Sequence, residues 1–330
     1  MSKLHLTLAC GDYDRTRPLI MDRVRPEGID LNYISLEPEE LFWRTIQNEE
    51  FDASEFSLAA YMVLRGRNDD RFVAIPVFPS RSFRHSAVFI NKNAGIKTAE
   101  DLKGKRIGVP DYTMTATVWI RGFFQHEHGV APSDVQWFCG GMDNPGRKQR
   151  INTKLPDNVH LEDIGNERTL SDMLEKGEID ALIGARAPKC FHSGSPNVDR
   201  LWPNYVETEI EYFKRTGIFP IMHTLVIRRD ILERYPWVAM SLYKAFSEAK
   251  DICQRELYTL AAPKYMMPWY IDQYEMALEQ MGQDFWPYGL EANRKTLEAF
   301  AQYSYEQGLS ENLVDVNTMF NLNTLRLYTI

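Results

Sequence analysis

The sequence predicts an α/β protein of two lobes with a cleft between them. Short β-rich runs alternate with helical patterns along most of the chain, which is typical of sheets covered by helices. One segment, residues 98–129, combines a capped entry, a strand and a helix, and is typical of the second lobe of such a protein. The 330 residues, of which 44% are hydrophobic, are enough for two cores. We expect the first lobe to comprise residues 1–92 and 222–330, and the second to comprise residues 93–221.

Each element follows from a local pattern. Strands are expected where apolar and β-branched residues run for four to seven positions, at 4–9, 29–34, 52–56, 72–77, 87–91, 106–109 and 179–183. Helices are expected at 38–48, from 59 to 64, from about 115 to 128 and at 169–176, where apolar residues recur at helical spacing. Gly177 is a natural C-cap for the last of these. After residue 260 the alternation gives way to helices with many aromatic residues, which we expect to pack across one lobe or to form a subunit interface.

Composition excludes several classes of protein. The net charge of -8 argues against a nucleic-acid surface, which needs a basic face. No apolar run approaches the roughly 18 residues of a membrane span. The four cysteines are far apart and lie in or beside apolar segments, so we expect buried free thiols and neither a metal site nor another cofactor. Residues 1–10 form an alternating strand and lack the apolar core of a signal peptide, so we expect a cytoplasmic protein.

Ligands of open α/β sheets bind beyond the carboxyl ends of the strands, so the loops after the strands are the places to search. The first such loop, residues 11–15, carries Asp12, which either belongs to a site or caps a solvated turn. The next strand ends with Glu55 and Ser57. Ser57 either caps the following helix or helps to bind an anion at its free amides.

The segment 80–86 is the sharpest cluster of charge in the chain. Arg81 and Arg84 each suit a carboxylate, held by two parallel hydrogen bonds, and His85 has the chemistry to titrate near neutrality. Ion pairing on the surface is the alternative for this cluster.

Two further loops complete the candidates. Thr113 and Thr115 open a helix whose first amides suit an anion. Arg186 follows the strand at 179–183, and His223 lies where the chain returns to the first lobe. His223 is either functional or a core histidine with a satisfied ring nitrogen.

These segments carry a resemblance that covers nearly the whole chain. With LHLTLACGDYDRTRPL at 4–19, SRSFRHS at 80–86 and YTMTATVWIRG at 112–122, the chain resembles the 4,5-dihydroxyphthalate decarboxylases, a family with the type II periplasmic-binding-protein fold. The phrase TAEDLKGKRIGVP at 98–110 occurs in many solute receptors, so it indicates the fold alone. The resemblance implies a cytoplasmic, homo-oligomeric carboxy-lyase of phthalate degradation, which converts 4,5-dihydroxyphthalate into protocatechuate and carbon dioxide.

Such a reaction needs a proton for the ring carbon, a base for the para hydroxyl and an anchor for the carboxylates. With the resemblance, we expect the catalytic groups to be His85, His223 and Asp12. We expect the groups that bind the aromatic dicarboxylate to be Arg81, Arg84, Ser57, Thr113, Thr115, Arg186 and Glu55.

Three other functions stay open at this point. The same loops suit a solute-binding protein for a small organic anion without catalysis. A biosynthetic enzyme of thiamine precursors shares the fold, although the chain carries no motif for it. A metal-assisted decarboxylase would need Asp12, Asp14, Glu55 and histidines to meet in space.

Overall fold

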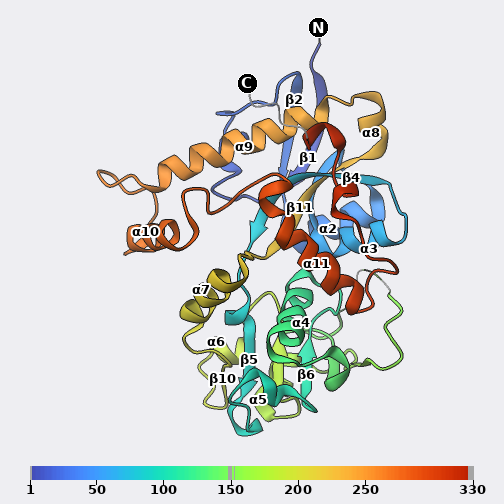
Figure 1. The fold of residues 1–330 in the computed structure, drawn as a ribbon, viewed down its shortest axis with the longest axis vertical. Helices are drawn as coiled ribbons and strands as arrows, with labels where there is room; N and C mark the ends of the chain where they lie inside the picture. The colour runs from blue at the N-terminus through green and yellow to red at the C-terminus, as the bar shows by residue number, and fades with distance from the viewer. Residues whose placement is uncertain (1, 148–150, 152, 326–330) are drawn as a thin grey trace.

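The computed structural model describes residues 2–147, 151 and 153–325, and divides them between two sheets, one above the other in Figure 1. The five-stranded sheet has the order β2-β1-β3-β11-β4, and the six-stranded sheet has the order β10-β5-β9-β6-β7-β8. The strands are β1 (Leu4–Cys10), β2 (Ile29–Ser35), β3 (Ala53–Ser57), β4 (Phe72–Arg81), β5 (Val88–Asn91), β6 (Arg106–Val109), β7 (Gln136–Cys139), β8 (His160–Asp163), β9 (Ala181–Ile183), β10 (Val198–Arg200) and β11 (Ile221–Arg228). The α/β class is confirmed, and the expected strands lie within a few residues of these bounds.

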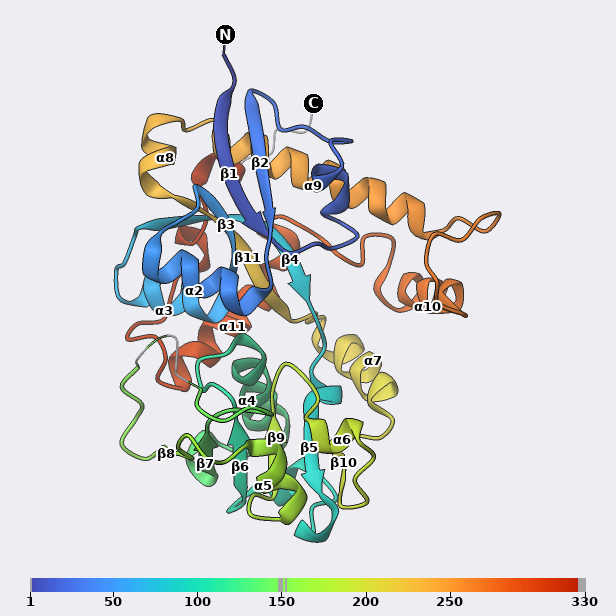
Figure 2. The same cartoon turned by 180° about the vertical axis from the view of Figure 1, so that it is seen from behind.

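The first sheet combines the first four strands of the chain with β11, the last strand. β2, β1 and β3 are parallel, whereas β11 lies antiparallel between β3 and β4, as Figure 2 shows from behind. β4 continues to Arg81, which pairs with Ile221, so this strand is four residues longer than the expected 72–77. Ser80 and Arg81, the first two residues of the expected loop at 80–86, are therefore part of the strand.

The second sheet is built from the middle of the chain. β9, β6, β7 and β8 are parallel to one another. At one edge of the sheet, β5 is antiparallel to β9, and β10 is antiparallel to β5. The chain passes between the sheets twice, after β4 and before β11. β5 already belongs to this second sheet, although residues 88–91 fall in the predicted first lobe. The lobe boundaries at 92 and 222 stay predictions.

The helices cover the sheets and join the lobes. They are α1 (Arg17–Ile20), α2 (Pro38–Asn48), α3 (Leu58–Gly66), α4 (Thr115–His128), α5 (Leu170–Lys176), α6 (Lys189–His192), α7 (Tyr205–Thr216), α8 (Arg229–Arg234), α9 (Val238–Leu257), α10 (Tyr270–Met281) and α11 (Arg294–Glu306). The buried residues of α3 are apolar, those of α4 are mostly apolar, and the two helices contact one another across the lobes.

Several local predictions are confirmed. Gly177 ends α5 with a φ of 75°, a left-handed conformation that glycine adopts without strain. Ser57 caps α3, because its hydroxyl accepts a hydrogen bond from the amide of Ala60. All four cysteines are buried and free. The histidines at the end of α4 do not meet: His126 bonds to Glu306 and His128 to Glu100.

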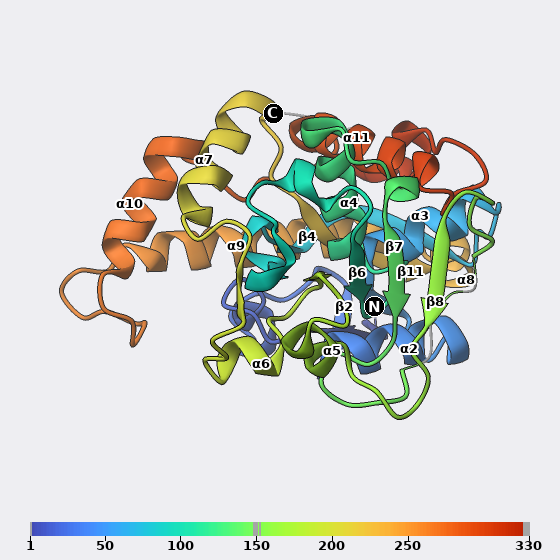
Figure 3. The same cartoon turned by 90° about the horizontal axis from the view of Figure 1, so that it is seen from below.

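The C-terminal region consists of helices and 3-10 turns, as expected, but its packing differs from the prediction of contact with one lobe. α11 contacts both α3 and α4, and Trp119 of α4 packs on Phe300 and Tyr303 of α11 with ring centroids 5.0 and 5.6 Å apart. α9 packs along the first sheet against β4 and α1, and α10 lies at the side of the molecule, as Figure 3 shows from below. Within the described ranges, none of the helices has both the length and the apolar character to cross a bilayer.

Candidate active site

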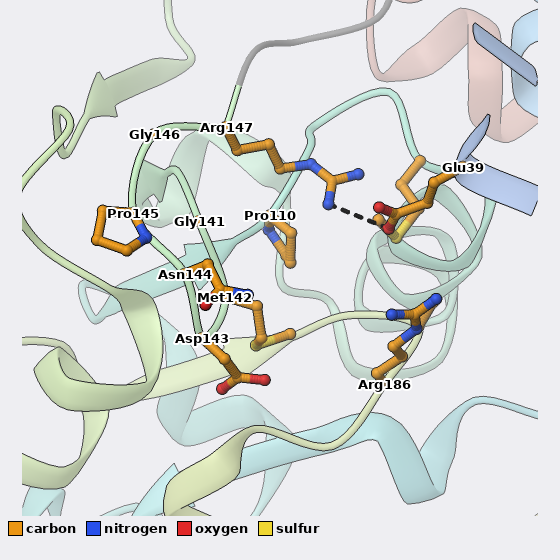
Figure 4. Close-up of a pocket in the computed structure, with 12 residues that line it drawn as sticks. Glu39, Pro110, Gly141, Met142, Asp143, Asn144, Pro145, Gly146, Arg147 and Arg186 are labelled. Carbon is orange, nitrogen blue, oxygen red and sulfur yellow. Dashed lines mark hydrogen bonds and ion pairs between the residues drawn. The ribbon is translucent and has the colours of Figure 1, made fainter. Parts of the chain in front are cut away.

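Two adjoining cavities lie between the lobes. The smaller, of about 150 Å³, is lined by α2, the first residues of α4, the loop after β9 and the start of β11. The larger, of about 290 Å³, is lined by the loop after β7 and is drawn in Figure 4. Four residues line both cavities: Glu39, Met114, Ala185 and Arg186. The two cavities therefore form one continuous site with contributions from both lobes.

A histidine and a buried carboxylate meet at the wall of the smaller cavity. Nδ1 of His223 lies 2.6 Å from Oε1 of Glu55, whose side chain is fully buried. Glu55 also accepts hydrogen bonds from the hydroxyl of Tyr13 at 2.9 Å and from the amide of Gly11 at 2.9 Å. A side chain at position 11 would collide with the Tyr13 ring at 2.6 Å, so glycine is required for this arrangement.

This network keeps Glu55 ionised. Burial alone would raise the pKa of Glu55, but the charge of His223 and the hydrogen bonds from His223, Gly11 and Tyr13 outweigh burial and lower it. Burial and the Glu55 charge raise the pKa of Tyr13, so its hydroxyl stays protonated and donates. Since an ionised carboxylate only accepts, Nδ1 of His223 carries a proton.

The other ring nitrogen of His223 is the one available for chemistry. The ring of Phe42 packs edge-on against the imidazole, with centroids 4.9 Å apart. The His223 side chain is 15% exposed and lines the smaller cavity, and its Nε2 makes no hydrogen bond to any described residue. A carboxylate-oriented imidazole with one open nitrogen is an arrangement that accepts and returns protons.

Two arginines supply positive charge to the same cavity. Arg84 donates from Nη1 to the carbonyl of Ala185 at 3.2 Å and contacts Met222, and burial lowers its pKa to about 10, so it stays charged at neutral pH. Arg186 is exposed and forms no hydrogen bond or ion pair with the described part of the chain. Neither guanidinium has a carboxylate within ion-pair distance among the described residues, so both are available for an anion.

The N-termini of α3 and α4 meet beside these cations. Ser57 and Thr115 share a hydrogen bond of 2.9 Å between their hydroxyls, and Thr115 also accepts from the amide of Ala59. The backbone amides of Thr115 and Ala116 have no partner in the described chain, and both residues line the smaller cavity. These amides add hydrogen-bond donors for an anion at the positive end of α4.

The structure brings together Glu55, Ser57, Arg84, Thr115, Arg186 and His223, which all belong to or adjoin the smaller cavity. It does not bring Thr113 to either large cavity. The Thr113 hydroxyl donates to Oδ1 of Asp111 at 2.7 Å and the residue is 5% exposed, so it stabilises the turn before α4.

Three more of the expected residues lie away from both cavities. Asp12 is exposed and pairs with Arg17 at 2.9 Å. Arg81 is buried in the first lobe, where its guanidinium donates to the carbonyls of Phe219 and Pro287 and to the Asn293 side chain. The extension of β4 explains this position, because strand pairing directs Arg81 to the C-terminal segment rather than to the cleft.

His85 is the third displaced residue. Its ring stacks on Phe123 with centroids 4.5 Å apart and packs against Trp202 and Tyr212. Burial lowers the pKa of His85 to about 4, so it is neutral at pH 7. The geometry gives no support to the proton-carrying role expected for His85, or to a clamp at Arg81.

Sequence reasoning did not single out Glu39 and Arg147, although both line the larger cavity and pair at 3.2 Å. Arg147 follows β7, and the run from Gly140 to Gly146 is a polar, glycine-rich loop at the carboxyl end of a strand. The rule that selected the other loops would have selected this one. Glu39 gives no such signal, because it lies in the first turn of a helix with ordinary amphipathic spacing.

The arrangement of possible metal ligands differs from that needed by the metal-assisted alternative. Asp14 pairs with Arg15 and Glu55 with His223, and across the described residues no three His, Cys, Asp or Glu side chains are grouped to hold an ion.

Comparison with known proteins extends the description. The chain is 41% identical to the 4,5-dihydroxyphthalate decarboxylase of Comamonas testosteroni, over 100% of both chains. It is 46% identical to the 4,5-dihydroxyphthalate decarboxylase of Pseudomonas putida, over 61% of this chain and 78% of that protein.

Similarity to binding proteins concerns the fold. Residues 32–145 match a family model described as the periplasmic substrate-binding protein of a phosphonate ABC transporter. The periplasmic aliphatic sulphonate binding protein SsuA of Escherichia coli superimposes with a TM-score of 0.54 at 15% identity, over 98% of this chain and 99% of that one. The alkanesulfonate-binding protein SsuA of Xanthomonas axonopodis pv. citri gives 0.52 at 11% identity, over 97% and 98%. The chain thus has a periplasmic-binding-protein-like fold, and by its full-length identity it belongs to the family of 4,5-dihydroxyphthalate decarboxylases.

Proposed function

We propose that this protein is a carboxy-lyase that removes one carboxylate from an aromatic dicarboxylate, with 4,5-dihydroxyphthalate as substrate and protocatechuate and carbon dioxide as products. The observation that carries the proposal is the meeting of the His223–Glu55 pair with two arginines that form no ion pair with any described residue. The names of the two relatives, one of them matched over its full length, support the same substrate.

Binding is the first requirement. A phthalate carries two adjacent carboxylates, and Arg84, Arg186 and the free amides at the start of α4 offer donors for both. A guanidinium that binds a carboxylate with two parallel hydrogen bonds fixes its orientation as well as its position. The carboxylate that stays on the product thereby holds the ring so that the reacting carbon faces His223.

Proton transfer is the second requirement. Direct loss of carbon dioxide would leave an unstabilised carbanion on the ring, so the ring carbon must gain a proton first. We assign this proton to Nε2 of His223, while the hydroxyl para to that carbon gives up its own proton to water and pushes electrons into the ring. The carbon–carbon bond to the carboxylate then breaks, its electron pair restores the aromatic ring, and the phenolate regains a proton. One proton replaces one molecule of carbon dioxide on the ring, and Nε2 of His223 then takes up a new proton from water.

The Glu55 carboxylate supports His223 in both states. It accepts the hydrogen bond from Nδ1 and so keeps the proton-transferring nitrogen directed at the cavity. It also balances the positive charge of the ring when Nε2 is protonated. A protein that only binds and releases an anion has no need of a buried carboxylate behind a histidine, so this pair favours catalysis over the solute-binding alternative.

One assay tests the proposal directly. Purified protein is incubated with 4,5-dihydroxyphthalate in deuterium oxide, with and without a chelator, and product and released gas are quantified. We expect carbon dioxide and product in equal amounts, with one deuterium on the carbon that lost the carboxylate. Tight binding without any product would overturn the proposal in favour of a solute-binding protein. Activity that is lost only when the chelator is present would indicate a metal-assisted reaction instead of the proposed mechanism.

We also propose that the protein acts in the cytoplasm as a homo-oligomer. Four free cysteines suit a reducing compartment. The connection between α9 and α10 exposes large apolar side chains, as interface cores do before assembly, namely Tyr258, Leu260, Met266, Met267 and Trp269. Cell fractionation tests the location, and light scattering tests the assembly, where a monomeric mass would contradict it.

A further inference from the structure

We propose that Glu39 and Arg147 recognise the hydroxyl groups of the substrate and thereby determine specificity for a hydroxylated phthalate. The inference rests on the proposed function, which supplies the aromatic dicarboxylate, and adds which residues distinguish it from plain phthalate. The pair spans the larger cavity: Glu39 belongs to α2 of the first sheet's lobe, and Arg147 follows β7 of the second sheet. Figure 4 shows the Arg147 side chain extended toward Glu39, with Nη1 3.2 Å from Oε1.

The positions of the arginines indicate how the substrate is oriented across the two cavities. Arg84 lines the smaller cavity and Arg186 lines both, so the carboxylates bind near His223 and the opposite edge of the ring points toward the larger cavity. A carboxylate side chain at that edge repels substrate carboxylates but accepts hydrogen bonds from hydroxyls. On 4,5-dihydroxyphthalate the hydroxyls lie on the ring edge opposite the carboxylates, so they meet this end of the site.

Glu39 is the acidic residue best placed for the role. Among the described residues that line the cavities, Glu39 and Asp143 carry carboxylates, and Glu39 alone lines both cavities. Asp143 already accepts the amide of Lys189 at 2.8 Å, at the start of α6. A hydroxyl that enters the larger cavity from the side of His223 therefore reaches Glu39 first.

Arg147 supplies what a carboxylate alone lacks. Its charge offsets that of Glu39, so a substrate dianion is not repelled from the site. Its Nε is buried and makes no hydrogen bond to any residue that the structure describes, although the same guanidinium bonds to Glu39. A substrate hydroxyl that donates to Glu39 and accepts from the Arg147 guanidinium would be bound by both side chains at once.

The backbone of the loop after β7 holds Arg147 in position. A Cβ at Gly141 would lie 1.7 Å from the carbonyl oxygen of Asn144, so this tight return of the chain requires glycine. Met142 packs against Gly184 of the neighbouring loop, where a Cβ would come within 2.8 Å of the Met142 methyl group. The loop that carries Arg147 is thus fitted against the loop that carries Arg186.

The test compares two ligands that differ only in hydroxyls. In a His223→Gln background, which prevents turnover, calorimetry measures the affinity of phthalate and of 4,5-dihydroxyphthalate. We expect Glu39→Ala to reduce the preference for the hydroxylated ligand by about tenfold or more, while phthalate binds at least as tightly as before, because the Arg147 charge is then no longer offset. The matched control is Glu40→Ala, which removes the next carboxylate on α2, paired on the surface with Arg44. An unchanged preference in Glu39→Ala would overturn the inference.

A second variant keeps the test independent of folding effects. Arg147→Met leaves Glu39 uncompensated, so both ligands should bind about tenfold more weakly, and the double variant Glu39→Ala with Arg147→Met should recover the affinity for phthalate. No recovery would show that Arg147 acts on the fold rather than through Glu39, against the inference. The parent enzyme assayed alongside separates the two proposals: if it releases no carbon dioxide, the proposed function fails, whatever Glu39 does.

Discussion

His223 and Glu55 are separated by 168 positions in the chain, yet Nδ1 of one lies 2.6 Å from Oε1 of the other. The contact is a diagonal pair on one face of two antiparallel strands, since His223 pairs with Ser57 and Leu225 pairs with Glu55 in the register of β11 and β3. The sheet therefore fixes the distance between proton carrier and carboxylate, without help from a flexible loop.

Replacement of His223 by glutamine should abolish most of the activity. Glutamine keeps the size and a hydrogen bond to Glu55 but cannot protonate the ring carbon, so we expect kcat to fall by about 10² or more, with KM changed by less than about threefold. Steady-state rates of carbon dioxide release measure this. The matched control is His126→Gln, which alters a histidine bonded to Glu306 outside the cavities. A His223→Gln enzyme with near-parental kcat would remove this residue from the mechanism.

Replacement of Tyr13 by phenylalanine should shift the pH profile. The hydroxyl of Tyr13 is one of the groups whose hydrogen bonds lower the pKa of Glu55. Without it, the pKa of Glu55 rises, so the acidic limb of the kcat profile should move to higher pH, by about one unit. Tyr258→Phe is the control, because its hydroxyl also donates to a glutamate but on the surface. An unshifted acidic limb would show that Glu55 is not held ionised through Tyr13.

Removal of the buried imidazole at position 85 should change stability rather than chemistry. Burial lowers the pKa of His85 to about 4, whereas an unfolded histidine has a pKa of about 6.5. The unfolded chain therefore binds more protons between these values, and the free energy of unfolding falls as the pH drops from about 6.5 to about 4, by up to about 3 kcal/mol from this group.

The variant His85→Phe should lack that component of the pH dependence, as measured by urea unfolding at several pH values. It should also keep kcat within about threefold of the parent, since His85 packs on Phe123 away from the cavities. His5→Phe, which removes an exposed histidine, is the control. A fall of kcat by about 10² in His85→Phe would return this histidine to the mechanism.

Loss of either free arginine should weaken anion binding. A hydrogen bond to a charged group contributes about 1.5 to 3 kcal/mol, so Arg84→Ala and Arg186→Ala should each bind phthalate at least about tenfold more weakly. Arg186→Lys should recover little, because an ammonium cannot bind a carboxylate with two parallel hydrogen bonds. Arg44→Ala, which breaks a surface pair with Glu50, is the control. Parental affinity in both cavity variants would place the anion elsewhere.

Local patterns in the sequence were sufficient for the α/β class, most strands and the cap at Gly177, because periodicity and glycine act over a few residues. They were insufficient where distant segments decide the outcome. The segment at 80–86 has the composition of a functional loop, but Arg81 pairs with Ile221 and points to Asn293, which the local sequence does not reveal. His85 is likewise defined by Phe123, Trp202 and Tyr212, from three other elements.

The functional roles of the site residues stay predictions. The search of the loops after strands named Arg84, Arg186 and the start of α4, and these residues line the same cavity because the carboxyl ends of the strands converge. The Glu39–Arg147 pair depends on how α2 of one lobe approaches a loop of the other, which is a tertiary relationship without a local signal at Glu39.

The packing of α11 on both α3 and α4 has a consequence for how ligands enter. A wide rotation of one lobe away from the other would separate Trp119 from Phe300 and Tyr303. These three buried rings would then be exposed to water, which costs free energy. α11 thus limits how far the two lobes can separate. A solute receptor benefits from lobes that open widely to take up and release its ligand. An enzyme benefits from catalytic groups that are already aligned when its substrate binds.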